Sequence, residues 1–413
     1  MKFTTKTTAI VFSLLVLIMA IPFSGQEADE VVVISNPKTP ELKMRIVFNE
    51  DLSIGEVEGD EYYLFGNTIY FNTDEEGNFY VSDSDNHRIQ KYDPEGKYLL
   101  TIGRKGQGPG EFQSLSAPKF DKDDNLFIYD MRNNRITFFD KNGEFLRQIR
   151  IPERYEDLYI NSNGFMLVYK YTESQEGSIQ KLTYTLSLFD EKFNPVVEFN
   201  KKVIETRLPT GSDLSSAARY FADALSHLAL RPQIRHALDD NDLVYCGYPE
   251  KYEICVFSPE GRLIKKILRD YEPILVSNKD KERFMEFANE FFSPRIFTDD
   301  LKKKAFPQIK YPKYKPAYHS FFLMENGWLA VIVDSVEGEY TLFDIFDQEG
   351  RYIGHFKTTE MILQTEGMFF EIQLLFKNGK VYTVAAEDDY KFVKRYNFEI
   401  QEYKDNKWIK KNN

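Results

Sequence analysis

A thirteen-residue pattern occurs twice in this chain. It reads Gly77-Asn78-Phe79-Tyr80-Val81-Ser82-Asp83-Ser84-Asp85-Asn86-His87-Arg88-Ile89 the first time and Asp124-Asn125-Leu126-Phe127-Ile128-Tyr129-Asp130-Met131-Arg132-Asn133-Asn134-Arg135-Ile136 the second time. Asp83 and Asp130 are 47 residues apart, and so are the turn glycines Gly96 and Gly143. Because two separate landmarks share one spacing, the pattern belongs to a repeated structural unit.

Each unit predicts four short strands. The predicted strands are rich in Ile, Phe, Tyr and Val, and Asp, Asn and Gly interrupt the run at the turns between them. In the second unit the strands are Pro118–Asp121, Leu126–Asp130, Arg135–Phe139 and Glu144–Arg150.

Weaker copies of the unit continue along the chain. The third unit shows two strands, the fourth to the sixth show three each, and Gly-containing turns again separate several of them. The segments are Leu182–Phe189 and Pro195–Phe199; Leu243–Cys246, Ile254–Phe257 and Arg262–Leu268; Gly327–Val333, Tyr340–Phe346 and Tyr352–Phe356; and Phe369–Phe376, Lys380–Ala385 and Phe392–Ile400.

The two ends of the repeat array complement each other. Leu52-Ser53-Ile54-Gly55 matches Leu100-Thr101-Ile102-Gly103, the end of a unit, yet no unit precedes it, and the sixth unit stops one strand short. A strand from the N-terminal side that completes the last sheet would close the array into a ring without open edges. We therefore predict an all-β fold, a six-bladed β-propeller over residues 41–408, with a tail at 409–413.

The repeat also resembles a known family. The pattern Gly-Asn-Phe-Tyr-Val-x-Asp-x-x-Asn-x-Arg-Ile, followed by the glycine-rich junction from Gly103 to Phe112, resembles NHL-repeat propellers of the exported bacterial type. The match is specific for residues 66–151 and diffuse beyond them. The resemblance implies the fold, and it implies function only loosely, because propellers host unrelated binding and catalytic roles.

The N-terminal residues predict export. Lys2 and Lys6 precede an apolar run from Ala9 to Ile21, which is shorter than the roughly 20 residues of a spanning helix and typical of a signal peptide. We expect a signal peptide at 1–25, a linker at 26–40 and a mature protein without a transmembrane span, in the periplasm, on the cell surface or outside the cell. An uncleaved anchor is the alternative.

The overall charge argues against one class of partner. Removing Lys2 and Lys6 leaves 51 basic against 65 acidic residues, a net charge of −14. Proteins bind phosphate backbones by neutralising them with Lys and Arg, so nucleic acid is an unlikely ligand.

Two insertions interrupt the repeats, at residues 201–232 and 271–316. The first places Leu214, Ala218, Phe221, Leu225 and Leu228 at helical spacing after Ser212-Asp213, and the second places Phe284, Phe287 and Phe291 on one helical face after Ser277-Asn278. Both lead from the last strand of one unit to the first strand of the next. In a propeller such connections emerge on the face that also carries the turns between second and third strands, so we expect a helically capped face.

The repeated turn residues have a structural interpretation and a functional one. Side chains of Asp83, Asn86, Asp130 and Asn133 can fix the turns by bonding local amides, and Arg88 and Arg135 can pair with the aspartates or stack on an aromatic ring. We favour this structural role because both units repeat it. As ligand-binding residues of the capped face we predict His87, Arg88, Arg104, Arg132, Arg135, Tyr311 and Tyr314. The second insertion also interleaves aromatic residues with lysines that could hold an anionic sugar or an acidic partner, namely Lys302, Lys303, Lys304, Lys310, Lys313 and Lys315.

Cys246 and Cys255 flank a predicted hairpin. If Glu250 and Lys251 form its turn, the two cysteines lie directly opposite each other at a closely spaced pair, about 4.5 Å between Cα atoms. They could form a disulfide in an oxidising compartment, or they could be two small buried thiols.

Two functions are compatible with these features. The first is a non-catalytic binding module for a protein, peptide or glycan, without a cofactor or a metal site. The alternative is a metal-dependent enzyme, such as a lactonase-like hydrolase or a lyase, with Ca²⁺ or Zn²⁺ in the central channel. Its ligands could come from Asp83, Asp130, His236 and His319, although none of the five histidines has the spacing of a metal site. No catalytic residue stands out in the sequence.

Overall fold

The computed structural model describes residues 30–40, 42, 44–209, 211–292, 297–333, 341–358, 373–387, 390–405 and 407–410, without the side chains of residues 290 and 291. The predicted signal peptide and most of the predicted tail lie outside these residues. Residues 409 and 410 of that tail belong to strand β26 (Lys407–Lys410), which pairs with β25 (Tyr390–Lys404).

The described strands form six sheets, and each sheet is one blade of the propeller. The two units with the repeated pattern are regular four-stranded blades whose strands follow the predicted ranges closely. Blade 1 consists of β3 (Ile69–Thr73), β4 (Phe79–Asp83), β5 (Arg88–Tyr92) and β6 (Tyr98–Ile102), and blade 2 of β7 (Lys119–Phe120), β8 (Leu126–Asp130), β9 (Arg135–Phe139) and β10 (Phe145–Arg150).

The weaker copies are blades as well, and each of them has its first strand. Blade 3 consists of β11 (Asp157–Ile160), β12 (Met166–Glu176), β13 (Ile179–Phe189) and β14 (Pro195–Arg207); blade 4 of β15 (Arg235–Leu238), β16 (Val244–Gly247), β17 (Glu253–Phe257) and β18 (Leu263–Arg269); blade 5 of β19 (Ser320–Leu323), β20 (Leu329–Val333), β21 (Thr341–Phe346) and β22 (Tyr352–Thr358); and blade 6 of β23 (Leu374–Lys377), β24 (Lys380–Glu387), β25 and β2 (Met44–Ile54).

Successive residues of one strand serve two different interfaces between blades. Phe79 and Val81 pack on blade 6, whereas Tyr80 between them packs on Leu126 and Ile128 of blade 2. Side chains of a strand alternate between the two faces of its sheet, so a blade that is covered on both faces needs an uninterrupted apolar run. Buried apolar clusters of this kind join every pair of consecutive blades, the sixth and the first included.

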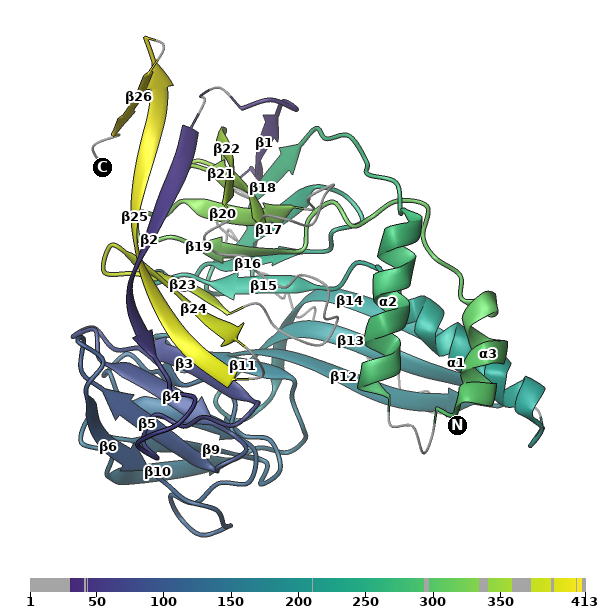
Figure 1. Cartoon of the computed structure of the whole chain (residues 1–413), viewed down its shortest axis with the longest axis horizontal. Coiled ribbons are helices and arrows are strands. Elements are labelled where there is room, and N and C mark those ends of the chain that lie inside the picture. The colour runs from purple at the N-terminus through teal and green to yellow at the C-terminus, as the bar shows by residue number, and fades with distance from the viewer. Residues whose placement is uncertain are drawn as a thin grey trace, which may run out of the picture. The chain divides into compact units, whose positions relative to one another are not determined.

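The ring is closed by a strand from the N-terminal side, as predicted. β2 pairs antiparallel with β25, with Ile54 opposite Val393 and Phe48 opposite Phe398. Figure 1 shows the two strands, purple and yellow, lying side by side along their length. The shared sheet joins the N-terminal and C-terminal parts of the chain, and β2 supplies the fourth strand of blade 6.

A further strand precedes β2. Residues 32–36, which we expected in a linker, form β1 (Val32–Asn36), which pairs parallel with β18 at the outer edge of blade 4. The Asn36 side chain donates to Leu268 O (3.0 Å) and Gly350 O (2.9 Å) and accepts from Tyr352 N (2.7 Å). The linker assignment is wrong here, because β-branched residues next to an open sheet edge gain backbone hydrogen bonds by pairing with it.

Blade 3 extends beyond the other blades. The insertion predicted from residue 201 begins later, because β14 continues to Arg207 and pairs with β13 up to Ile179.

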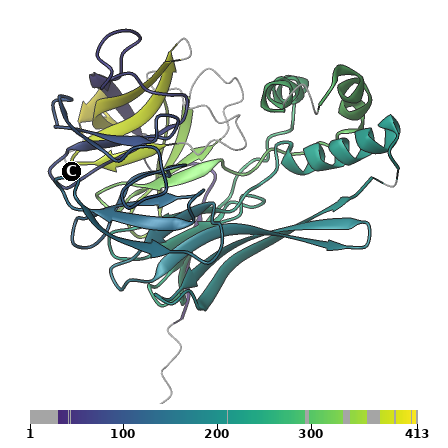
Figure 2. The same cartoon turned by 90° about the horizontal axis from the view of Figure 1, so that it is seen from below.

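The insertions contain α1 (Leu214–Leu228), α2 (Asn278–Phe291), α3 (Asp299–Ala305) and the short 3₁₀ helix η1 (Phe306–Gln308). In Figure 2 the helices lie over one face of the extended strands of blade 3. Helix α1 contacts β14, and Tyr220 Oη donates to Gln180 Oε1 (3.2 Å) near the β12–β13 turn, so the helices share a face with that turn.

Candidate functional site

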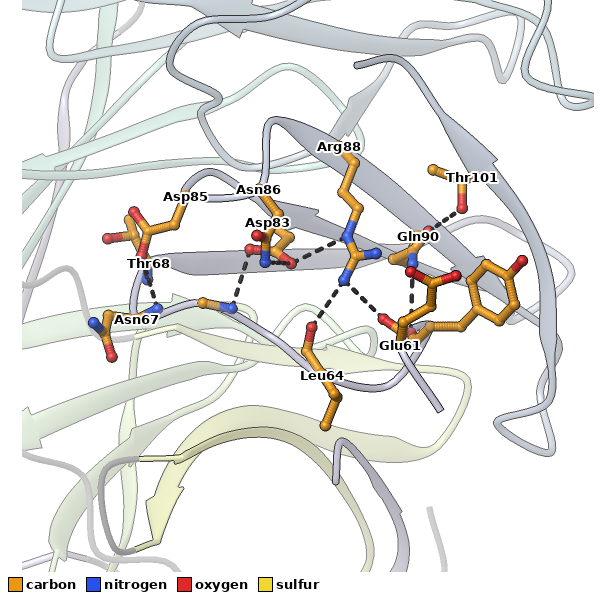
Figure 3. Close-up of polar contacts among 12 residues, drawn as sticks. Glu61, Leu64, Asn67, Thr68, Asp83, Asp85, Asn86, Arg88, Gln90 and Thr101 are labelled. Atoms are coloured by element: carbon orange, nitrogen blue, oxygen red, sulfur yellow. Dashed lines mark hydrogen bonds and ion pairs between the residues drawn. The ribbon is translucent and has the colours of Figure 1, made fainter. Parts of the chain in front are cut away.

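The repeated Asp-x-x-Asn-x-Arg turn of blade 1 holds the chain that arrives from blade 6. Asp83 Oδ2 accepts from Asn86 Nδ2 (2.7 Å) and Arg88 Nε (3.3 Å), and the Arg88 guanidinium donates to Leu64 O (2.8 Å) and Glu61 O (3.0 Å). Figure 3 shows Arg88 between the Asp83 carboxylate and these two carbonyls. The turn therefore fastens the junction between the last and the first blade.

The second copy does the same for the next junction. Arg135 donates to Gln107 O (2.8 Å), Gly108 O (2.8 Å) and Glu111 O, and the Asp130 carboxylate accepts from the backbone N–H groups of Gln113 and Ser114, both at 3.0 Å. The glycine-rich junction is thus a blade-to-blade connection bound by the turn. Because backbone carbonyls occupy both guanidinium groups, we reassign Arg88 and Arg135 from ligand binding to a structural role.

The remaining residues predicted to bind ligand do not form one site. Arg104 is exposed and pairs with Glu111 at 2.9 Å, Arg132 is exposed, and His87 is a half-buried turn residue with φ of 56°. Tyr311 packs edge-on against Phe284 inside the helical insertion, whereas Tyr314 is exposed with Lys313 Nζ 4.8 Å from its ring centre. These side chains belong to different turns and loops, so we do not retain them as a single set.

The first strands of the blades line the interior of the ring. β15 contacts β19, and β19 contacts β23, so consecutive first strands are neighbours. Polar side chains bridge them: Gln373 donates to Ile69 O (2.9 Å), Asn72 donates to Pro118 O (3.0 Å), and Lys119 donates to Leu158 O (2.8 Å). We call these bridging residues, together with Asp157 and His236, the inner polar belt.

The most densely charged part of the belt joins three blades. The Asp157 carboxylate pairs with the Lys119 ammonium and lies 3.3 Å from His236 Nε2, and each of the three side chains is at most 14% exposed. The rings of Tyr159 and Tyr169 lie 5.9 and 5.5 Å from the His236 ring. Burial alone would raise the pKa of the Asp157 carboxyl, but Lys119 and His236 outweigh it and hold that pKa below its ordinary value.

Neither Lys119 nor Asp157 is conspicuous in the sequence. Each is a single charged residue on a short first strand. Asp157 lies 38 residues after Lys119 in the chain and 79 residues before His236. A buried charge needs a partner, so a charged residue inside a predicted strand is the one signal that could have identified them.

The two insertions, separate in sequence, pack into one helical unit. Ala218, Ala222 and Leu225 of α1 form a buried cluster with side chains of the second insertion, among them Phe297 and Leu301. The predicted caps are present: Asp213 accepts from the backbone of Ser215 and Ser216, and Ser277 with Asp280 forms a capping box. Lys315 anchors the second insertion through a 2.8 Å ion pair with the Asp280 carboxylate.

A cavity of about 640 Å³ lies between this helical unit and blade 3. Its walls come from α1, from the ends of β13 and β14, and from the segment that begins at η1. Of the lysines singled out in the sequence, Lys310 lines it. The charged residues and the tyrosine that line the cavity are Glu205, Arg207, Arg219, Tyr220, Asp223 and Lys310.

Cys246 and Cys255 occupy the predicted register, directly opposite each other on β16 and β17. Both are free thiols in the structure. Burial raises the pKa of the Cys246 thiol to about 12 and that of the Cys255 thiol to about 11. They line a smaller cavity of about 210 Å³ beside Asn200, whose Nδ2 lies 3.7 Å from Cys246 Sγ.

The ligand set considered for a channel metal does not come together. Asp83 and Asp130 are held in the two turns described above, while His236 belongs to the inner polar belt. Within the described part of the chain, no three His, Cys, Asp or Glu side chains are close enough to hold a metal ion. The described residues also contain no helix that is long and apolar enough to cross a membrane.

Comparison with known proteins supports the fold. Residues 52–244 match the family DUF5128, described as "6-bladed beta-propeller". The crystal structure of a "Putative exported protein" from Bacteroides fragilis is similar over 90% of this chain and 100% of its own, with 13% identity and a TM-score of 0.50. No curated protein sequence matches the chain.

Two further solved structures are similar at lower scores. A member of the duf4221 family from Bacteroides vulgatus is 10% identical over 87% of this chain and 99% of its own (TM-score 0.46), and virginiamycin B lyase from Staphylococcus aureus is 9% identical over 86% and 99% (TM-score 0.41). The similarity to the Bacteroides fragilis structure, at 13% identity, shows the fold alone. The chain is a six-bladed β-propeller, and the resemblance to NHL repeats remains a prediction.

Proposed function

We propose that this protein is an exported, non-catalytic binding module that holds a protein, peptide or glycan ligand on its helically capped face. The observation that carries the proposal is the cavity of about 640 Å³ between α1 and blade 3. Its volume lies within the range of about 300–1,000 Å³ that is common for ligand sites. The N-terminal apolar run from Ala9 to Ile21 supports export.

The helical unit provides a specific surface on a common scaffold. The blades supply a rigid support, whereas the insertions supply side chains that the regular repeats lack. Functional residues often lie on connections that a rigid scaffold positions, and the cavity is built from such connections at the junctions of blades 3 to 5.

Blocking the cavity tests the proposal. Gln308 is exposed at the cavity rim, so Gln308→Trp should narrow the entrance without disturbing the core. Lys122→Trp is the matched control, because Lys122 is an exposed turn residue between β7 and β8 that does not line the cavity. Ligands found on peptide and glycan arrays should bind the Gln308→Trp protein at least about tenfold more weakly in calorimetry. Equal affinity for both variants would remove the cavity from the proposal.

The enzyme alternative has one observation in its favour. His236, Asp157 and Lys119 converge between the first strands of three blades, and a carboxylate that accepts from an imidazole can orient it for proton transfer. Metal analysis of the purified protein separates the two functions. A stoichiometric Ca²⁺ or Zn²⁺ that is lost in His236→Gln would favour an enzyme with a site in the channel over a pure binding module.

A further inference from the structure

The cavity gathers positive charge in a chain whose net charge is −12. Arg207 lies at the end of β14, Arg219 on α1 and Lys310 just after η1, so three segments contribute one cation each. All three residues are exposed. The lining therefore carries three cations against two carboxylates on a protein that is acidic overall, and an excess of positive charge attracts anions.

These cations are largely unneutralised by the described residues. Arg219 NH2 donates to Ser216 Oγ at 3.3 Å, and its guanidinium forms no other hydrogen bond or ion pair with a described side chain. The side chains of Arg207 and Lys310 form no ion pair or hydrogen bond with any described residue. By contrast, Arg88 and Arg135 each donate to two or more backbone carbonyls of the blade junctions.

The two carboxylates of the cavity have partners other than the three cationic side chains. Glu205 Oε1 lies 3.5 Å from Nζ of Lys181, its neighbour on β13, and Asp223 Oδ2 accepts from the Arg207 backbone N–H at 3.4 Å. They do not pair with the three cations. A ligand carboxylate could therefore bind the arginines, whose planar guanidinium groups match a carboxylate with two parallel hydrogen bonds.

The rest of the lining favours a ligand rich in hydroxyl groups. Nine of the thirteen lining residues are polar or charged. The hydroxyl oxygens of Ser216 and Tyr220 can still accept although each O–H donates within the protein, and Gln308 keeps one N–H donor and its carbonyl acceptor. A peptide would instead require apolar sockets for alternate side chains or a free strand edge for its backbone. Four lining residues are apolar, and one of them, Ala222, is buried in the helical core.

We propose that the cavity binds an acidic saccharide, a short oligosaccharide that carries the carboxylate of a uronic acid. This inference rests on the proposed binding function and specifies its ligand. The carboxylate lies between Arg207 and Arg219 with Lys310 nearby, and the sugar hydroxyls bond the polar lining. Binding at such a site weakens as salt concentration rises, because the cations are exposed and screened.

Calorimetry with two matched sugars tests the proposal. The probes are trigalacturonate and the neutral galactotriose, which differ in their carboxylates. The wild-type protein should bind trigalacturonate at least about tenfold more tightly than galactotriose. One charge-assisted hydrogen bond is enough to produce a difference of this size. The triple variant Arg207→Gln, Arg219→Gln and Lys310→Gln should lose this preference. The triple control Lys97→Gln, Lys122→Gln and Lys141→Gln removes the same charge from exposed residues outside the cavity and should keep it.

The possible failures are distinguishable. Equal affinity for the two sugars, or a preference that the cavity variant retains, would overturn the acidic-saccharide inference. If Gln308→Trp still weakens ligand binding while the acidic-saccharide inference fails, the proposed binding function remains supported. Tighter binding of tetraglutamate than of trigalacturonate would replace the saccharide by an acidic peptide. A protein in which Gln308→Trp changes the binding of no ligand would contradict both proposals.

Discussion

Asp157 and His236 are 79 residues apart in the chain, yet Nε2 of the histidine lies 3.3 Å from Oδ2 of the aspartate. The two residues belong to the first strands of blades 3 and 4, and Lys119 of blade 2 completes the contact on the other side of the carboxylate. One carboxylate thus links three blades. Its energetic role can be measured independently of any ligand.

Asp157→Asn should destabilise the protein by about 3–5 kcal/mol at pH 7, because it leaves the buried Lys119 ammonium without its carboxylate. The pKa of Asp157 is lowered in the folded protein, so its contribution to stability is complete above its unfolded pKa of about 3.9 and disappears as the pH falls further. Urea denaturation of wild type and variant should give a constant difference from pH 7 to 5 and a smaller one at pH 3.

Asp123→Asn is the control for this prediction, because Asp123 is an exposed turn residue. It should change the free energy of unfolding by less than about 0.5 kcal/mol at either pH. A difference between wild type and Asp157→Asn that grows toward pH 3 would contradict the predicted direction of the pKa shift.

Ile54→Ala tests the closure of the ring. Ile54 is the last residue of β2, is 1% exposed, and packs between blades 6 and 1. Its truncation should cost about 2–5 kcal/mol in the free energy of unfolding, as for other buried aliphatic residues. Ser53→Ala changes an exposed neighbour on the same strand and should have little effect. Equal midpoints in thermal denaturation would show that the closing strand contributes little.

Arg135→Lys tests the structural role of the repeated turns. The lysine keeps the charge but cannot place donors on Gln107 O, Gly108 O and Glu111 O together, since these need a planar fork. We expect a loss of about 1.5–3 kcal/mol of stability in urea denaturation. Arg132→Lys, at an exposed position of the same turn, should be neutral. If Arg135→Lys instead abolished ligand binding without loss of stability, our reassignment of Arg135 would be wrong.

The cysteine pair should be present as two thiols that react slowly. With pKa values of about 12 for Cys246 and about 11 for Cys255, roughly one thiol in a thousand or fewer is ionised at pH 8. Alkylation by iodoacetamide at pH 8 should therefore be at least about a hundredfold slower in the native than in the urea-unfolded protein. Absence of thiols in unfolded, unreduced protein would establish a disulfide between the two strands instead.

The parts of the fold that follow from local patterns could be predicted. The apolar runs of β4 and β8 and the turns after them repeat at a constant spacing, and the match of Leu52–Gly55 to the end of a unit is enough to predict that β2 completes blade 6. Capping residues such as Asp213 and Ser277 also predict the starts of their helices correctly. Each of these signals involves only a few neighbouring residues, so it can be recognised in the sequence.

The site residues were harder to predict, for a physical reason. Arg135 was among the predicted binding residues, because a sequence does not show which backbone carbonyls a turn will meet. Residues Val32–Asn36 looked like a linker, because the open edge of blade 4 exists only after that blade has folded. The helices were predicted one by one, but their packing on each other depends on how blades 3 to 5 are arranged.

The sequence by itself therefore determined the all-β class, the number of units, the closure of the ring and the place of the helical insertions, since each depends on spacing along the chain. Only the tertiary structure decided which side chains meet. Lys119, Asp157 and His236 converge in the interior, and Arg207, Arg219 and Lys310 line one cavity, because the fold brings together segments that are separate in the chain. Contacts of this kind leave no periodic trace in a single sequence.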